Sequence, residues 1–182
     1  MTDRATMITW EAARLFVERG YHATGMDEIG EAVGITGPAL YRHFAGKGEL
    51  LLAVVEADTR GAEAEVAEVY AEDGCPEHLL RALVERRTRR ALTDAHLMIV
   101  ASREVNNLPP GRRPAMVRRR RLVREEWAHL VAECRPELND PETRAMVDGV
   151  QAIIYGLGSA EAKSMVLDVL FPRRHTGTCP CS

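Results

Sequence analysis

Residues 21–47, YHATGMDEIGEAVGITGPALYRHFAGK, decide the fold of this chain. Apolar residues recur there at helical spacing between glycines, which predicts one helix over residues 26–33 and a second, short helix over residues 37–44. Gly34 marks a tight turn between them, because glycine accepts the left-handed backbone that such a turn requires. Pro38 is tolerated in the first turn of the second helix, where an N–H would have no partner within the helix. The stretch therefore predicts two short helices joined by a sharp turn.

One side of these two helices is apolar and predicts a small shared core. The residues expected to face it are Ile29, Val33, Ile35, Leu40 and Phe44. Burying Leu40 and Phe44, which are one helical turn apart, turns Tyr41 and His43 outward, with Arg42 near the rim. Two helices with a glycine-bearing turn and an exposed second helix form the helix-turn-helix arrangement, whose second helix enters a DNA major groove. A structural three-helix head with no DNA partner is the alternative.

Helical spacing continues through nearly all of the remaining sequence, and strand-like alternation is absent. Further helices are predicted over residues 4–19, 48–72, 77–91, 94–106, 112–134, 141–156 and 159–170. We therefore expect an all-α protein of about nine helices. Residues 1–47 would form a three-helix head, residues 48–172 a helical body and residues 173–182 a disordered tail.

Composition bounds the class of protein. With 182 residues, of which 46% are hydrophobic and 28% charged, the chain can bury a packed core and is typical of a soluble protein. A net charge of −3 argues against a strongly basic, non-specific nucleic-acid binder, and residues 1–47 carry five basic and six acidic side chains. The apolar runs are short and the N-terminus lacks a signal-peptide pattern, so we expect a cytoplasmic protein.

No pattern of catalytic or metal-binding residues stands out. The histidines are scattered, and paired carboxylates, a nucleophile motif and a glycine-rich phosphate loop are absent, which argues against an enzyme. Cys75 and Cys134 are isolated, whereas Cys179 and Cys181 lie near His175 in the tail. These last three could bind a metal, but a mobile tail gives its ligands no supporting residues. We expect no metal and no cofactor.

The sequence from Phe16 to Lys47, F-x-x-R-G-Y-x-A-T-x-M-x-E-I-x-E-A-V-G-I-T-x-x-A-L-Y-R-H-F-x-x-K, resembles the DNA-binding domain of the TetR family of bacterial repressors. The resemblance implies an all-α homodimer with a three-helix DNA-binding head and a divergent body that binds a ligand. The head would be residues 1–47, and residues 48–172 would bind the effector and form the dimer. The sequence of the body is not diagnostic of any ligand.

Carried over position by position, the resemblance implies which residues contact DNA. Those that would read the groove are Thr36, Gly37, Pro38, Ala39 and Tyr41, and those that would bind phosphate are His43 and Lys47, supported by Thr24. Gly25 replaces the hydroxyl residue usual at that helix cap, and Gly37-Pro38 replaces a position often held by a long polar side chain. Few base-edge hydrogen bonds remain, so thymine-methyl contacts, the Tyr41 ring and DNA shape would supply most of the discrimination.

The last two helices are expected to form a dimer interface, with a core inside one chain as the alternative. The interface residues expected from the resemblance are Met146, Val150, Ile153, Ile154, Leu157, Met165 and Val169. The residues that could line a ligand pocket in the body are His96, Leu97, Val100, Trp127, Leu130, Val131 and Tyr155. A dimer would let two short reading helices meet successive turns of the major groove.

Residues 81–124 carry thirteen arginines against three acids. Either these arginines form a solvated helix face paired with the glutamates of residues 56–72, or they form an entrance that attracts an anionic effector such as an acyl-CoA. The function expected is a repressor that binds a palindromic operator as a homodimer and is released by a small effector of anionic or acyl type. The alternative is a DNA-binding regulator, activator or repressor, whose body binds a protein partner and no small molecule.

Overall fold

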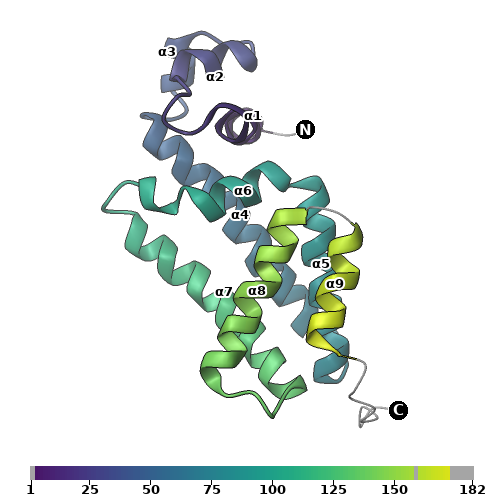
Figure 1. Ribbon diagram of the computed structural model, residues 1–182. Helices are drawn as coiled ribbons and strands as arrows, with labels where there is room; N and C mark the ends of the chain where they lie inside the picture. Colours follow the sequence, from purple (N-terminus) through teal and green to yellow (C-terminus); the bar gives the residue numbers. More distant parts are fainter. Residues whose placement is uncertain (1–2, 158–159, 173–182) are drawn as a thin grey trace. The chain divides into compact units, whose positions relative to one another are not determined.

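The computed structural model describes residues 3–157 and 160–172 (Figure 1). Over these residues the chain forms nine α-helices, one short 3-10 helix and no strand, which confirms the all-α prediction. The elements are α1 (Arg4–Arg19), α2 (Met26–Ala32), α3 (Gly37–Tyr41), α4 (Lys47–Tyr70), α5 (Pro76–Thr93), α6 (Ala95–Arg103), η1 (Val105–Asn107), α7 (Arg113–Cys134), α8 (Asp140–Leu157) and α9 (Ala160–Leu170). None of these helices combines the length and the apolarity that a membrane span needs. The expected tail at residues 173–182, with His175, Cys179 and Cys181, lies outside the described residues.

The chain divides into two compact units. The first unit comprises Met1–Arg60 and His96–Arg118, and the second comprises Gly61–Ala95 and Arg119–Ser182. The helices α4 and α7 therefore each contribute residues to both units. This division does not coincide with the boundary expected after residue 47, because α6 and the start of α7 group with the N-terminal helices.

The first unit is organised around a core that α1, α2 and α3 share with the start of α4 and with α6. In this unit α2 packs against both α1 and α3 (Figure 1). The side chains with no exposed surface in this core are Ile8, Ala12, Ala13, Ile29, Leu40, Leu50, Leu51, Val54, Val55 and Ala101. Because α2 and α3 are too short to be stable alone, burial in this core holds them in place.

The turn between α2 and α3 depends on its backbone conformation. Gly34 has a φ of 69°, in the left-handed region where a Cβ is strained. The N–H of the next residue, Ile35, then donates to the carbonyl of Gly30 at 2.9 Å, and the Ile35 side chain packs against the core. The third helix ends at Tyr41, earlier than predicted, because the N–H groups of His43 and Phe44 both donate to the Leu40 carbonyl and close the helix in a turn.

Replacing Gly34 with Ala should destabilise the protein by about 1–2 kcal/mol, because alanine pays the steric cost of the left-handed backbone. Gly46→Ala is the matched control: a Cβ at either glycine would meet no atom within 4 Å, but Gly46 does not have a positive φ. Calorimetric unfolding of the two variants measures the difference. Equal destabilisation would contradict the role given to the turn.

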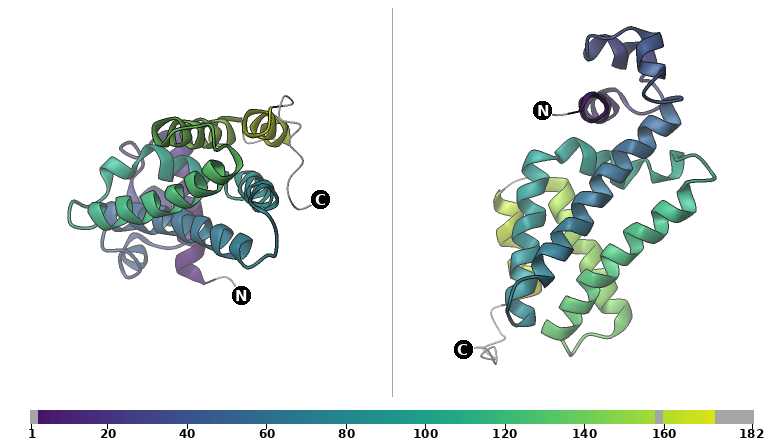
Figure 2. Two further views of the ribbon diagram at one scale, coloured as in Figure 1. Left: turned by 90° about the horizontal axis from the view of Figure 1, so that it is seen from below. Right: turned by 180° about the vertical axis from the view of Figure 1, so that it is seen from behind.

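In the second unit, α5, α8 and α9 pack against one another (Figures 1 and 2). Their inward faces and that of α7 are mainly apolar, and the buried polar side chains on them include Arg87, Thr88 and Thr143. The residues of this unit with no exposed surface are Leu80, Leu83, Val84, Val69, Trp127, Leu130, Val131, Val147, Val150, Ile154, Ala162, Val166 and Leu170. The helical spacing of these residues along each element explains why the sequence predicts the helices of this unit well.

A buried ion-pair cluster lies in the same unit. Glu65 on α4 stands between two guanidinium groups of α5: its Oε2 is 2.7 Å from Nε of Arg87, and its Oε1 is 2.6 Å from Nε of Arg90. The side chains of Glu65 and Arg87 are only 7% and 2% exposed. Gly61, one helical turn before Glu65, makes room for this arrangement, since a Cβ there would lie 2.9 Å from Nη1 of Arg90.

Other arginines of the basic stretch also pair with acids of α4. Arg86 forms ion pairs with Glu68 and Glu72, and Arg119 donates two hydrogen bonds to Glu63, at 2.9 and 2.6 Å. Pairing with the glutamates of residues 56–72 is therefore observed. The expectation of a solvated face was wrong for Arg87, which is buried because it faces the interior of the unit rather than solvent.

Replacing Glu65 with Ala should lower the free energy of unfolding by about 3–5 kcal/mol, because two guanidinium groups lose their shared carboxylate inside the protein. Glu63→Ala is the control, since the Glu63–Arg119 pair is 39% and 37% exposed and should contribute about 1 kcal/mol or less. Urea unfolding followed by circular dichroism compares the two variants. A loss at Glu65 no larger than that at Glu63 would show that the buried cluster does not stabilise the unit.

Candidate nucleic-acid interface

The position of α3 is fixed by two apolar side chains and leaves its other side open. Leu40 has no exposed surface, and Phe44 is half-buried against the core of the first unit. Tyr41 is 53% exposed, and Arg42 and His43 are also exposed. The structure thus places an aromatic ring, a guanidinium group and an imidazole ring at the end of α3, on the side away from the core.

The start of α3 carries few polar groups. Thr36 and Pro38 are exposed, and Gly37 and Ala39 are half-buried. Asp27 of α2 lies against this end of the helix, since a Cβ on Gly37 would lie 2.7 Å from its Oδ1. Sequence reasoning missed Asp27, because nothing in the local pattern shows that its carboxylate meets Gly37. An acid at this position disfavours a phosphate close to the start of α3.

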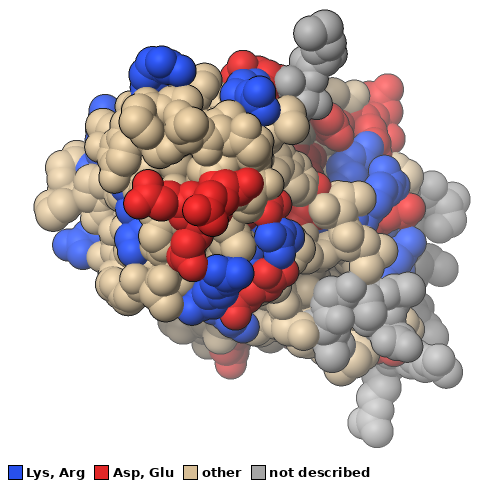
Figure 3. Space-filling model, turned by 90° about the horizontal axis from the view of Figure 1, so that it is seen from above, with Lys and Arg blue, Asp and Glu red and all other residues tan. Residues whose placement is uncertain are grey.

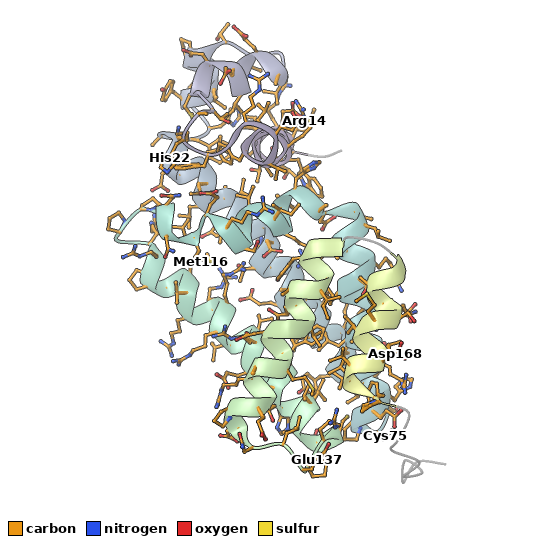
Figure 4. All side chains as sticks on the ribbon, in the orientation of Figure 1. Arg14, His22, Cys75, Met116, Glu137 and Asp168 are labelled. Carbon is orange, nitrogen blue, oxygen red and sulfur yellow. The ribbon has the colours of Figure 1, made fainter. Side chains whose placement is uncertain are left out.

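Lys47 joins the loop before α2 to the start of α4. Its ammonium group donates to the carbonyls of His22 at 3.0 Å and Thr24 at 2.9 Å, and it lies 4.9 Å from the centre of the Tyr21 ring (His22 is labelled in Figure 4). The Thr24 hydroxyl is buried and donates to the Gly20 carbonyl at 2.9 Å. In this structure the Thr24 hydroxyl and two of the three ammonium protons of Lys47 are therefore used inside the protein.

The first turn of α2 is capped by a side chain from within it. The N–H of Gly25 donates to Oε2 of Glu28, three residues later, at 2.8 Å. Arg19 pairs with the other oxygen of Glu28 at 2.6 Å. The Gly25 amide, and after it the Arg19 guanidinium, lower the pKa of the Glu28 carboxylate, so this group stays charged at neutral pH.

Charge on this part of the surface is mixed. The view in Figure 3 looks down on the end formed by α2 and α3, where acidic side chains gather beside separate groups of basic ones. On this face of the described residues no continuous basic surface is visible. Binding to DNA here would depend on a few placed groups rather than on a broad positive field.

The residues expected to line a ligand pocket are divided between the two units. His96, Leu97 and Val100 belong to the first unit, where Leu97 and Val100 are part of the core. Trp127, Leu130, Val131 and Tyr155 belong to the second unit. A surface hollow of about 530 Å³ in the first unit is lined by other residues, namely His43, Phe44, Ala45, Glu49, Leu52, Ala53, Glu56 and Arg112.

The residues expected at a dimer interface differ in exposure. Met165 and Val169 on α9 are 48% and 42% exposed, and Met146 and Ile153 on α8 are half-buried. Val150 and Ile154 have no exposed surface in a single chain, because this face of α8 packs within the unit. These two belong to the core, which corrects the expectation that they meet a second chain. The side chain of Leu157 lies outside those that the structure describes.

Comparisons with known proteins agree with this geometry. Residues 8–54 match the model of a family described as bacterial regulatory proteins, tetR family. Over 54 residues the chain is 48% identical to the HTH-type transcriptional activator FasR of Mycolicibacterium smegmatis, and this segment covers 30% of the chain and 25% of FasR. The chain thus matches about a quarter of the length of this curated relative.

Two solved structures extend the likeness to the whole fold. A transcriptional regulator of the TetR/AcrR family from Thermobifida fusca is 27% identical, with a TM-score of 0.64, over 95% of this chain and 100% of that one. AibR, solved in complex with isovaleryl coenzyme A and operator DNA, is 22% identical, with a TM-score of 0.80, over 93% of this chain and 99% of that one. Residues 8–54 thus match the tetR family of bacterial regulatory proteins, and the all-α fold of the chain is similar to that of solved regulators of this family.

Proposed function

We propose that this chain is a transcriptional repressor that binds a palindromic operator as a homodimer in the cytoplasm. The observation that carries the proposal is the exposed side of α3, where Tyr41 is 53% exposed while the neighbouring Leu40 is fully buried. A helix fixed on one side and open on the other, within a segment that matches the tetR family, suits a DNA major groove.

Release by a small effector, of anionic or acyl type, completes the proposal. AibR, which has the same fold, was solved with isovaleryl coenzyme A and operator DNA together. An effector that binds one conformation of the dimer better than the other weakens operator binding by that difference in affinity. A difference of roughly 2 kcal/mol corresponds to about thirtyfold.

The relative FasR is named a transcriptional activator, and this name favours activation as a second candidate function. In this alternative the chain is a DNA-binding activator or repressor whose body binds a protein partner and no small molecule. Co-purification of a stoichiometric protein with the chain, and no bound small molecule, would favour it.

We propose that the protein recognises DNA through few hydrogen bonds to base edges, through the Tyr41 ring and through contacts to phosphates. Tyr41 would contact base edges or thymine methyl groups, with Thr36, Gly37, Pro38 and Ala39 close to the groove. His43 and the remaining ammonium proton of Lys47 would bind phosphates, while Thr24 supports them by fixing the loop. Because Lys47 also holds that loop, it contributes to both the shape of the head and its charge.

Tyr41→Ala should weaken binding to the specific operator roughly tenfold or more, because it removes a base contact while leaving the buried side of α3 intact. Lys47→Ala should weaken binding to all duplexes and reduce the slope of affinity against salt by about one. Fluorescence anisotropy on the gene's own upstream region and on random duplex, at several salt concentrations, measures both effects.

Tyr70→Ala is the control for these variants, since Tyr70 is 43% exposed on α4 in the second unit. It should bind the operator as the wild type does. Equal affinity of the wild type for upstream and random duplex would refute the proposed function.

The proposed dimer would use the exposed side of α8 and α9. Besides Met165 and Val169, this side includes Gly149, around which a Cβ would meet no atom within 4 Å. Glycine at an exposed helix position permits close approach of a second chain. The C2 arrangement that this implies is the commonest among homo-oligomers.

Gly149→Trp should convert the dimer to a monomer and weaken operator binding at least tenfold, because the ring occupies the space of the second chain. Gly149→Ala should leave the dimer intact and raise helix stability by about 1 kcal/mol. Analytical ultracentrifugation of both variants measures the oligomeric state. A monomeric wild type, or a dimer that tolerates the Gly149→Trp substitution, would place the interface elsewhere.

A further inference from the structure

Arg87 is a buried cation of the second unit whose guanidinium group lacks hydrogen-bond acceptors for part of its N–H groups. Its side chain is 2% exposed, and its Nε faces Glu65 at 2.7 Å. Its Nη1 reaches the hydroxyl of Tyr155 only at 3.5 Å, the limit of a hydrogen bond. Its Nη2 makes no hydrogen bond to any residue that the structure describes. A buried guanidinium edge without an acceptor is unfavourable and marks a place where an acceptor would bind.

A second unpaired donor lies beside it. Trp127 on α7 is fully buried, and its Nε1 has no hydrogen-bond acceptor within the described part of the chain. The guanidinium carbon of Arg87 is 5.9 Å from the centre of the Trp127 ring. The structure therefore brings together two N–H donors and the Tyr155 hydroxyl, from α5, α7 and α8, inside one unit.

The helices that carry these three groups are mainly apolar where they are buried, although Thr88 on α5 and Thr143 on α8 are also buried. The fully buried residues on them include Leu83, Val84, Leu130, Val131 and Ile154. A ligand that met the donors would thus be surrounded mainly by hydrocarbon. Such surroundings select a molecule with one polar end and an apolar body.

We propose that the second unit binds the carboxylate of an otherwise apolar small molecule, with Nη2 of Arg87 and Nε1 of Trp127 donating to its oxygens and the Tyr155 hydroxyl beside them. The inference rests on the proposed function, for which it names the class of effector. A guanidinium group favours an anion over a neutral acceptor, and two N–H donors match the two oxygens of a carboxylate. A dianionic phosphate would need further donors, because Glu65 already neutralises part of the Arg87 charge.

The bound carboxylate would join three helices that are separate in sequence. Of these, α7 also contributes residues to the first unit, as does α4, which carries Glu65. Binding in the second unit would therefore act on helices that continue into the unit containing α3. This continuity gives the effector a physical route to operator affinity.

The test uses the protein's own tryptophan. The chain has two tryptophans, so Trp10→Phe leaves Trp127 as the single emitter. Octanoate is titrated into this variant, with butanoate and benzoate as smaller carboxylates and with octanol and octyl phosphate as matched molecules. We expect octanoate to change the Trp127 emission and raise the thermal midpoint, and to bind at least tenfold more tightly than octanol or octyl phosphate.

Variants of the donors locate the site. Arg87→Met should weaken octanoate binding about 10- to 100-fold, because it removes a charged donor. Tyr155→Phe keeps the ring and Trp127→Phe keeps a smaller aromatic ring, and each removes one donor. Calorimetry should show about three- to tenfold weaker binding. Arg89→Met is the control, since Arg89 is on the same helix but its side chain is 68% exposed. If Arg87→Met does not fold, the two conservative variants decide the outcome.

Three results would overturn the proposal: no binding of any of the three carboxylates at millimolar concentration, equal binding of octanol or octyl phosphate, or wild-type affinity in all three donor variants. The proposed function is judged separately, by operator binding of the ligand-free protein. If the wild type binds its operator but no carboxylate, the proposed function stands and the proposed effector class is wrong. A wild type that binds no specific duplex loses the function, while the fluorescence titration still decides the carboxylate site.

Discussion

A helix of five residues cannot keep its shape in water, and this constraint governs the whole first unit. Isolated helices become stable only at about 12–15 residues, so α3 depends on what it packs against. Leu40 supplies that packing from inside α3, and Phe44 supplies it from the turn that follows. The core from α1, α2, α4 and α6 therefore holds this short helix in place while its outer side stays exposed.

The signals that predict this head are local, which is why the sequence predicts it closely. Gly34 indicates a left-handed turn on its own, and the apolar spacing of Ile29, Leu40 and Phe44 indicates the buried sides of the two short helices. The end of α3 could not be predicted as closely. The residues after Tyr41 still have helical spacing, although the N–H groups of His43 and Phe44 both donate to the Leu40 carbonyl and end the helix. Helical periodicity shows which side is buried but not where the last turn tightens.

The polar interior of the second unit could not be predicted in the same way. An arginine-rich helix has the sequence of a solvated surface, and nothing near Arg87 shows that Glu65 of another helix meets it. Likewise, the apolar pattern of Leu97 and Trp127 predicts burial for both but cannot assign them to different units. Such facts depend on contacts between distant segments, so they require the folded chain.

Gly61 has a mechanical consequence beyond making room for Arg90. It is the first residue of the second unit, directly after Arg60, the last residue of this segment of the first. Glycine weakens a helix interior by about 1 kcal/mol relative to alanine. We therefore expect α4 to bend most easily at Gly61, where it passes from the first unit to the second. Arg90 lies against Gly61 and pairs with Glu65, so a displacement of Glu65 would reach this turn of α4 through Arg90. Under the proposed function, Gly61 would therefore influence how far binding in the second unit affects the first, although it lies in neither the proposed DNA-binding surface nor the proposed carboxylate site.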